Sequence, residues 1–196
     1  MDKIKQHQHF VLNKPFGYLS QFIRNETTRK NKKLLSELGD FPEGTMSVGR
    51  LDQDSEGLLF LTTDGKASFA VTGNKQVEKE YYIQVDGEIT AEAIELLKNG
   101  VEISVKKEKY TTLPCNAFKI EHKPIFPPRA KPIRDERHGP TSWVSITVKE
   151  GKFRQVRKMS AAVGFPTLRL IRVRIGNVTL GDLESGKHIE VESFDI

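Results

Sequence analysis

The chain has 196 residues, of which 37% are hydrophobic and 29% charged, and this composition excludes an intrinsically disordered protein. The single cysteine, Cys115, excludes an internal disulfide, and the lack of long apolar runs or of a secretory signal excludes a membrane span and export, so we expect a cytoplasmic protein. The net charge of +5 favours an anionic partner.

Alternating apolar residues and turn residues predict short strands and helices in the first half of the chain. Strands are expected at His9–Leu12, Leu58–Thr62 and Lys79–Val85. A short helix is expected at Lys33–Leu38, and a second one after Asp64, whose carboxylate suits the N-cap position.

The second half continues the same pattern of strands and short helices, without a strict strand–helix–strand alternation. This pattern predicts an α+β fold with a largely antiparallel or mixed sheet, flanked by short helices and loops. The expected elements are a helix at Thr90–Lys98, strands at Val101–Val105, Asn116–His122 and Ser142–Val148, an extended proline-rich surface loop at Lys123–Pro140, a helix at Phe153–Val163 and a strand at Leu168–Ile175.

Positive charge is concentrated in two segments of the chain. Residues 1–35 sum to +6 and residues 151–181 to +7, which leaves the remainder acidic. Such segments indicate a surface that receives a polyanion, and nucleic acid is favoured over a membrane because the basic residues do not lie on one long amphipathic helix. A set of solvated lysine and arginine side chains is the alternative interpretation.

The segment with the most chemical information is VGRLDQDSEGLLFLTTDG, at residues 48–65. Arg50 precedes Asp52 by two residues, so both side chains lie on one face of an extended backbone, where the guanidinium favours the ionised carboxylate. A tight turn in which Asp52 or Ser55 caps backbone N–H groups explains the same residues. The residues alone leave both interpretations open.

The segment resembles the signature of the pseudouridine synthases of the small-subunit and large-subunit rRNA family, in which Gly-Arg-Leu-Asp is followed after two residues by Ser-Glu-Gly-Leu-Leu. Three further motifs resemble that family and occur in its order along nearly the whole chain. Phe153 and Glu80 depart from its usual residues without touching an expected catalytic position. The further motifs are NKPFG at 13–17, KEY at 79–81, and EGKFRQVRKM at 150–159 with its closing strand at 164–172.

The resemblance implies the pseudouridine synthase fold in one catalytic domain over residues 1–196, bilobed, with two subdomains that share a sheet. The match is greatest to members that modify large-subunit rRNA and lack an S4 RNA-binding domain. Only eight residues precede the first expected strand, which leaves no room for S4.

The resemblance also implies catalytic roles for three residues. Asp52 is the carboxylate that attacks C1′ of the target uridine or removes a ribose proton, and the sequence leaves both routes open. Tyr81 stacks on the base and takes part in proton removal from C5, and Arg157 keeps Asp52 ionised and oriented. Because the reaction is an isomerisation, no metal or cofactor is expected.

We expect a monomer that binds ribosomal RNA and flips the target base out of its stack. The basic segment Arg24–Lys33 and the proline-rich loop are expected to contact the surrounding RNA. Two alternatives remain: a non-catalytic RNA-binding or ribosome-assembly factor, and a pseudouridine synthase that acts on small-subunit rRNA or tRNA. The residues expected to contact RNA are Arg50, Arg154, Lys158, Lys14, Arg29, Lys30 and Arg172.

Overall fold

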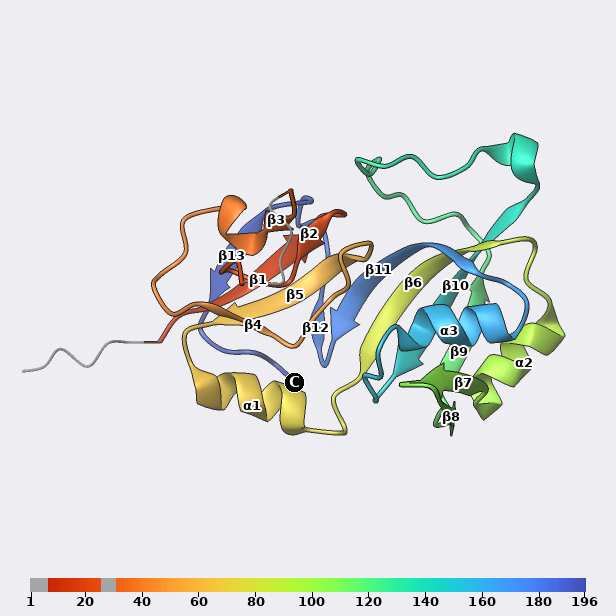
Figure 1. Ribbon diagram of the computed structural model, residues 1–196, viewed down its shortest axis with the longest axis horizontal. Coiled ribbons are helices and arrows are strands. Elements are labelled where there is room, and N and C mark those ends of the chain that lie inside the picture. Colours follow the sequence, from red (N-terminus) through yellow and green to blue (C-terminus); the bar gives the residue numbers. More distant parts are fainter. Residues whose placement is uncertain (1–6, 26–30) are drawn as a thin grey trace, which may run out of the picture. The chain divides into compact units, whose positions relative to one another are not determined.

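The computed structural model describes residues 7–25 and 31–196 and divides into two compact units (Figure 1). Unit 1 comprises Met1–Val77 and Ile175–Ile196, and unit 2 comprises Glu78–Arg174. None of the helices within the described residues is both long enough and apolar enough to span a membrane.

Unit 1 is built around an antiparallel sheet. Strand β1 (His9–Lys14) pairs with β13 (His188–Val191) on one side and with β5 (Glu56–Thr62) on the other. Strand β4 (Met46–Val48) also pairs with β5. Every residue of β5 is buried, which explains the continuous apolar run that predicted this strand.

Helix α1 (Gly65–Gly73) follows β5 and begins as expected from the sequence. The Asp64 carboxylate accepts a hydrogen bond of 2.8 Å from the backbone N–H of Lys66. That bond holds the pKa of Asp64 below its usual value. The expected N-cap is therefore confirmed.

The prediction of a helix at Lys33–Leu38 is wrong for the first two residues. Strand β3 (Lys33–Leu34) pairs in parallel with β2 (Tyr18–Leu19), and only the single turn η1 (Leu35–Glu37) is helical. The Glu37 carboxylate accepts a 2.9 Å hydrogen bond from the Leu34 N–H. Pairing of the first two residues with β2 leaves too few residues for a longer helix.

The strands of unit 2 pair with one another in a defined order. Strand β6 (Lys79–Asp86) pairs antiparallel with β10 (Thr141–Val148) over its whole length, and β10 pairs antiparallel with β9 (Asn116–Ile120). Strand β11 (Thr167–Ile175) lies beside β6 on the other side. These four strands agree with the elements expected from the sequence.

A hairpin in unit 2 was only half predicted. Strand β7 (Glu102–Val105) was expected, whereas its partner β8 (Glu108–Thr111) was not. The two strands are joined by Lys106 and Lys107, both of which have positive φ, +51° and +72°. Lysine is uncommon in this conformation, and the turn contains neither Asn-Gly nor Asp-Gly. The sequence therefore contains no signal for this hairpin.

Helices α2 (Ala91–Asn99) and α3 (Gln155–Ala162) cover the core of unit 2. The Thr90 hydroxyl caps α2 by accepting a 3.2 Å hydrogen bond from the Ala93 N–H, as predicted. Leu97 is completely buried in a cluster to which both helices and strands β6, β7, β9, β10 and β11 contribute.

The remaining elements are short. Apart from the 3₁₀ turn η2 (Glu136–His138), the proline-rich segment between β9 and β10 has no regular structure, as expected. Most of the pairings are antiparallel and helices are few, so the α+β class is confirmed. The short elements are β12 (Val178–Thr179) and η2 (Glu136–His138).

Replacing Leu97 by alanine is predicted to lower the free energy of unfolding by about 2–5 kcal/mol, because it leaves a cavity in the core of unit 2. Urea denaturation measures this change. The neighbouring Leu96 is 55% exposed, so Leu96→Ala is the matched control and should stay within about 0.5 kcal/mol of the unchanged protein. Equal effects of the two substitutions would contradict this packing.

Candidate active site

In unit 1, hydrogen bonds hold the backbone on both sides of Asp52. The buried Ser20 hydroxyl donates to the Leu51 carbonyl (2.8 Å) and accepts from the Leu51 N–H (3.0 Å). The Gly17 N–H donates to the Gln53 carbonyl (2.8 Å), and the Gln53 side-chain amide returns a bond to the Gly17 carbonyl (3.0 Å). The position of the half-buried Asp52 is therefore set by its two sequence neighbours.

Two glycines make this arrangement possible. Gly17 has φ +94° and Gly49 has φ +70°, a region that L-residues with side chains rarely adopt. Both belong to segments that the sequence analysis singled out, NKPFG and GRLD. The positive φ at these two positions belongs to the chain path that brings residue 17 against residue 53.

The turn that was the alternative explanation for this segment is present. The Ser55 N–H donates to the Asp52 backbone carbonyl at 3.1 Å, so the turn is closed by backbone atoms. Ser55 and Glu56 are buried at the start of β5. Because a carbonyl closes the turn, this bond does not require the Asp52 carboxylate.

Lys14 does not lie where an RNA contact requires it. Its side chain is 0% exposed, and its ammonium donates to the carbonyls of Pro15 (3.0 Å) and Tyr18 (2.8 Å). The expectation of an RNA contact is therefore corrected to a structural role, in which Lys14 shapes the loop that reaches Gly17. Arg50, by contrast, is exposed.

In unit 2, Tyr81 lies on β6 opposite Ile146 of β10 and packs against the core cluster. Lys79 precedes it by two residues, so the strand places both side chains on one face, as expected. Lys79 is half-buried, and burial together with the nearby positive charge of Arg172 lowers its pKa. Arg172 itself is buried, which argues against the RNA contact expected of it.

Helix α3 carries the other residues expected at the site. Arg157 is half-buried, and its neighbours Val156 and Met159 belong to the core cluster against which Tyr81 packs. Arg154 is the N-cap residue and has φ +53°, an uncommon conformation for arginine that is held at the helix start. The Lys158 ammonium donates to the Ser104 carbonyl of β7 at 2.6 Å.

A network that the sequence analysis did not find supports the start of α3. The Glu150 carboxylate accepts hydrogen bonds from the Tyr110 hydroxyl, the Leu113 N–H (2.8 Å) and the amide of buried Gln155 (2.8 Å). The bond to Glu150 raises the pKa of Tyr110. The Lys152 ammonium lies 4.6 Å from the centre of the Tyr110 ring. The network connects the β7–β8 hairpin to the loop that carries Arg154.

Only some of the basic residues in the acid-free segment 151–181 lie at the surface of the protein. Arg169 is buried like Arg172, and Arg174 donates to Glu80 (3.0 Å) and Glu78 (3.1 Å). Burial lowers the pKa of Arg174, but the bonds to the two carboxylates outweigh this and raise it overall. Arg174 is therefore paired with two carboxylates of unit 2, and Arg169 and Arg172 are removed from the surface.

Unit 1 thus carries Asp52 and Arg50, and unit 2 carries Tyr81 and Arg157. Arg29 and Lys30, also expected to bind RNA, lie outside the described residues. Within residues 7–25 and 31–196, no group of three or more His, Cys, Asp or Glu side chains is arranged to hold a metal ion.

Comparison with known proteins identifies the class. Residues 8–162 match the RNA pseudouridylate synthase family, and the chain belongs to this family. Its relatives include the ribosomal large subunit pseudouridine synthase E of Xanthomonas campestris pv. campestris, 40% identical over 90% of this chain and 91% of that protein. The protein of the same name from Vibrio parahaemolyticus is 40% identical over 93% of this chain and 73% of that protein.

A solved structure agrees with this assignment. A crystal structure of a pseudouridylate synthase superposes with a TM-score of 0.74 at 28% identity, covering 96% of this chain and 71% of that one. The family resemblance and the α+β fold expected from the sequence are therefore confirmed.

Replacing Ser20 by alanine is predicted to lower kcat for pseudouridine formation about tenfold, because the buried N–H and carbonyl of Leu51 lose their shared partner and the backbone beside Asp52 is released. Steady-state kinetics at saturating RNA measures this change. The affinity for RNA should stay within twofold.

Ser47→Ala is the matched control, since the Ser47 hydroxyl donates its hydrogen bond to the Ser20 carbonyl (3.1 Å). It should keep kcat within about twofold, a difference of well under 1 kcal/mol. An unchanged kcat in Ser20→Ala would show that the bonds to Leu51 do not position the carboxylate.

Proposed function

We propose that this protein isomerises a specific uridine of large-subunit ribosomal RNA to pseudouridine, with Asp52 as the catalytic carboxylate. The observation that carries the proposal is the identity of 40%, along about 90% of the chain, with enzymes named for this reaction on the large subunit. The tethered backbone around Asp52 supports the assignment of the carboxylate.

The reaction breaks the N1–C1′ bond of the uridine, turns the base and joins C5 to C1′. N1 gains a proton and C5 loses one, so the step is balanced without an oxidant, a reductant or a metal. Asp52 acts either by attacking C1′ or by removing a ribose proton, which gives a glycal intermediate. A side chain whose backbone is already fixed suits either role, because little reorganisation is needed as charge develops.

Tyr81 and Arg157 are proposed to complete the catalytic set. The Tyr81 ring lies at the edge of the unit 2 core, a position that supports stacking on the target base, worth about 1–3 kcal/mol. Arg157 is proposed to keep the Asp52 carboxylate ionised and oriented. The substrate base reaches these groups only after it leaves its stack in the RNA.

RNA binding is proposed for the basic residues that the structure leaves partly or fully exposed, Arg50 and Arg154, with Lys158 as a weaker candidate because it is bound to Ser104. Arg29 and Lys30 remain candidates on their charge alone. We further propose that the protein acts in the cytoplasm as a monomer.

A non-catalytic RNA-binding or ribosome-assembly factor would use the same basic residues. It has no need for a carboxylate whose neighbouring backbone is bonded on both sides, and this observation favours the enzyme. A pseudouridine synthase for small-subunit rRNA or tRNA would have the same catalytic residues and is distinguished only by its substrate.

Tritium release from RNA labelled at C5 of uridine tests the proposal, because C5 loses its hydrogen in the reaction. The purified protein is predicted to release tritium from large-subunit rRNA and not from small-subunit rRNA or tRNA. Tritium release only from small-subunit rRNA or only from tRNA would show that the enzyme acts on that RNA instead. No release from free RNA or ribosomal particles would favour the non-catalytic factor.

Mapping pseudouridines in all stable RNAs of a deletion strain identifies the nucleotide. We expect one pseudouridine to disappear from large-subunit rRNA and to return when the gene is restored.

A further inference from the structure

The segment Lys123–Pro140, here called the arm, joins β9 to β10 and extends away from the sheet of unit 2 (Figure 1). It contains five of the nine prolines of the chain and, apart from η2, no regular structure. Irregular connections of this length are uncommon in compact domains and usually serve a function.

The first part of the arm is fixed to the sheet by an aromatic contact. The Phe126 ring lies 5.7 Å from that of Trp143 and 6.4 Å from that of Tyr82, measured between centres. The Arg169 guanidinium lies 5.6 Å from the centre of the Phe126 ring and donates a 2.9 Å bond to the Pro127 carbonyl. Arg169, counted as a basic surface residue from the sequence, therefore holds the arm in place.

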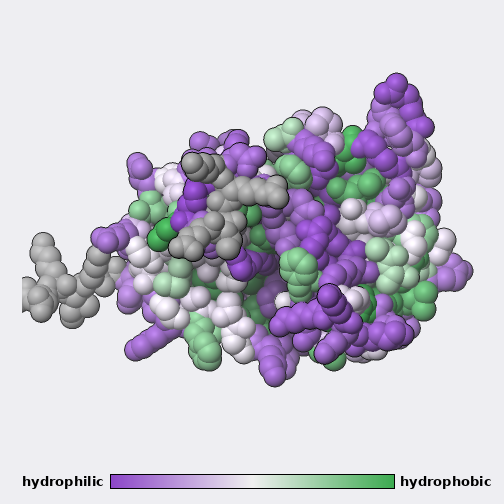
Figure 2. Space-filling view, in the orientation of Figure 1, coloured by the Kyte–Doolittle hydropathy of each residue, from purple (hydrophilic) through white to green (hydrophobic). Residues whose placement is uncertain are grey.

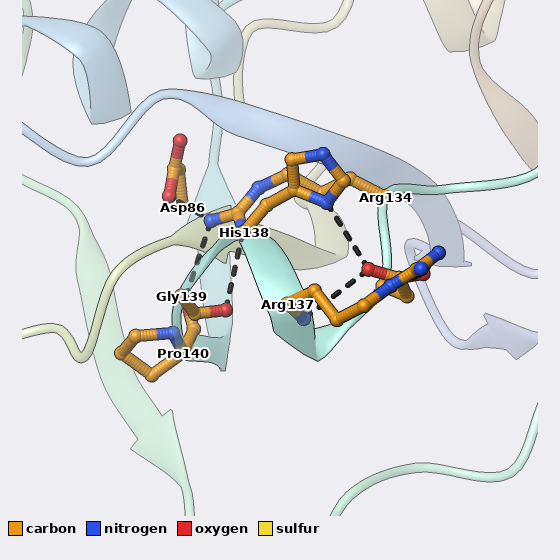
Figure 3. A network of polar contacts seen from close by, with 7 residues as sticks. Asp86, Arg134, Arg137, His138, Gly139 and Pro140 are labelled. Atoms are coloured by element: carbon orange, nitrogen blue, oxygen red, sulfur yellow. Dashed lines mark hydrogen bonds and ion pairs between the residues drawn. The ribbon is translucent and has the colours of Figure 1, made fainter.

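The second part of the arm is fixed by an ion pair, here called the clasp, between Arg134 and Asp86 at the end of β6 (Figure 3). Arg134 also donates to the carbonyls of Gly139 (3.1 Å) and Pro140 (3.3 Å). The Arg134 side chain is 18% exposed and the Asp86 side chain 45%, so it is the arginine side of the pair that is shielded from solvent.

The arm also presents exposed basic side chains. The arm has five Lys or Arg residues and two acids, and Lys123, Lys131 and Arg137 are exposed. Figure 2 shows its outer end as strongly hydrophilic. Asp135 binds both Arg137 (2.9 Å) and His138 (3.1 Å), which gives the outer end a defined shape.

We infer that Asp86 and Arg134 are positioning residues that hold the arm in the conformation in which it binds RNA. The choice of RNA as the partner of the arm rests on the proposed function, whereas the clasp is observed in the structure. Phosphates are the partner that net positive charge on a projecting segment favours. The prolines and the clasp restrict the arm before binding, so less conformational entropy is lost when the RNA docks.

The clasp predicts an effect that charge alone does not. Asp86→Asn removes a negative charge, so a purely electrostatic surface would bind RNA more tightly. If the clasp positions the arm, Asp86→Asn should instead weaken binding to unmodified large-subunit rRNA by roughly 3- to 10-fold. Arg134→Gln should weaken it similarly, and the double variant should bind no worse than the weaker single variant.

Filter binding over a range of salt concentrations measures these affinities. Lys131→Ala combined with Arg137→Ala should weaken binding and reduce the salt slope by about 1–2. The control is Lys109→Ala, an exposed lysine of the β7–β8 hairpin that is also paired with a carboxylate, and it should change neither quantity. Trypsin should cleave the arm faster in both clasp variants, with unchanged thermal unfolding.

Tighter binding by Asp86→Asn, or independent effects of the two clasp substitutions, would overturn the positioning role. An unchanged salt slope in the Lys131→Ala, Arg137→Ala variant would show that the arm does not contact the RNA phosphates. Tritium release by the unchanged protein is measured in parallel: its absence refutes the proposed function, whereas normal release with unaltered RNA affinity in every arm and clasp variant refutes the arm alone.

Discussion

The hydrogen bonds of one buried hydroxyl have the greatest consequence in unit 1. Ser20 satisfies both the N–H and the carbonyl of Leu51, and the pair formed by Gly17 and Gln53 holds the chain on the other side of Asp52. A carboxylate on backbone that is already fixed in this way requires little further ordering of the chain when the substrate binds. The burial of β5 directly after the turn extends the constraint, because the chain cannot shift without moving a fully buried strand.

Positive charge has two separate uses in this molecule. Within unit 2, the carboxylates of Glu78 and Glu80 pair with the partly buried Arg174, and a loop carbonyl and an aromatic ring contact the buried Arg169. Arg154, at the start of α3, and Lys131 and Arg137, on the arm, reach the surface. Arg169 holds the arm that carries Lys131 and Arg137, so its part in the proposed RNA contact is to position that segment.

Local patterns in the sequence predicted the elements whose ends depend on local chemistry, such as the caps at Asp64 and Thr90. Features that depend on distant residues were missed or misassigned. In the sequence, Lys14 resembles a surface lysine, but in the fold its ammonium is buried and donates to two backbone carbonyls. The turn at Lys106 contains no glycine, so no local pattern indicates it. The Glu150 network joins residues 40 positions apart, so no local pattern indicates it.

The carboxylate at position 52 is proposed to perform the chemistry. Single-turnover tritium release with Asp52→Asn tests it most directly, with Asp54→Asn as the control that removes a carboxylate from the same turn. Asp52→Asn should abolish release while its affinity for large-subunit rRNA stays within a few-fold, and Asp54→Asn should retain most of the activity. Near-normal turnover by Asp52→Asn would contradict the account.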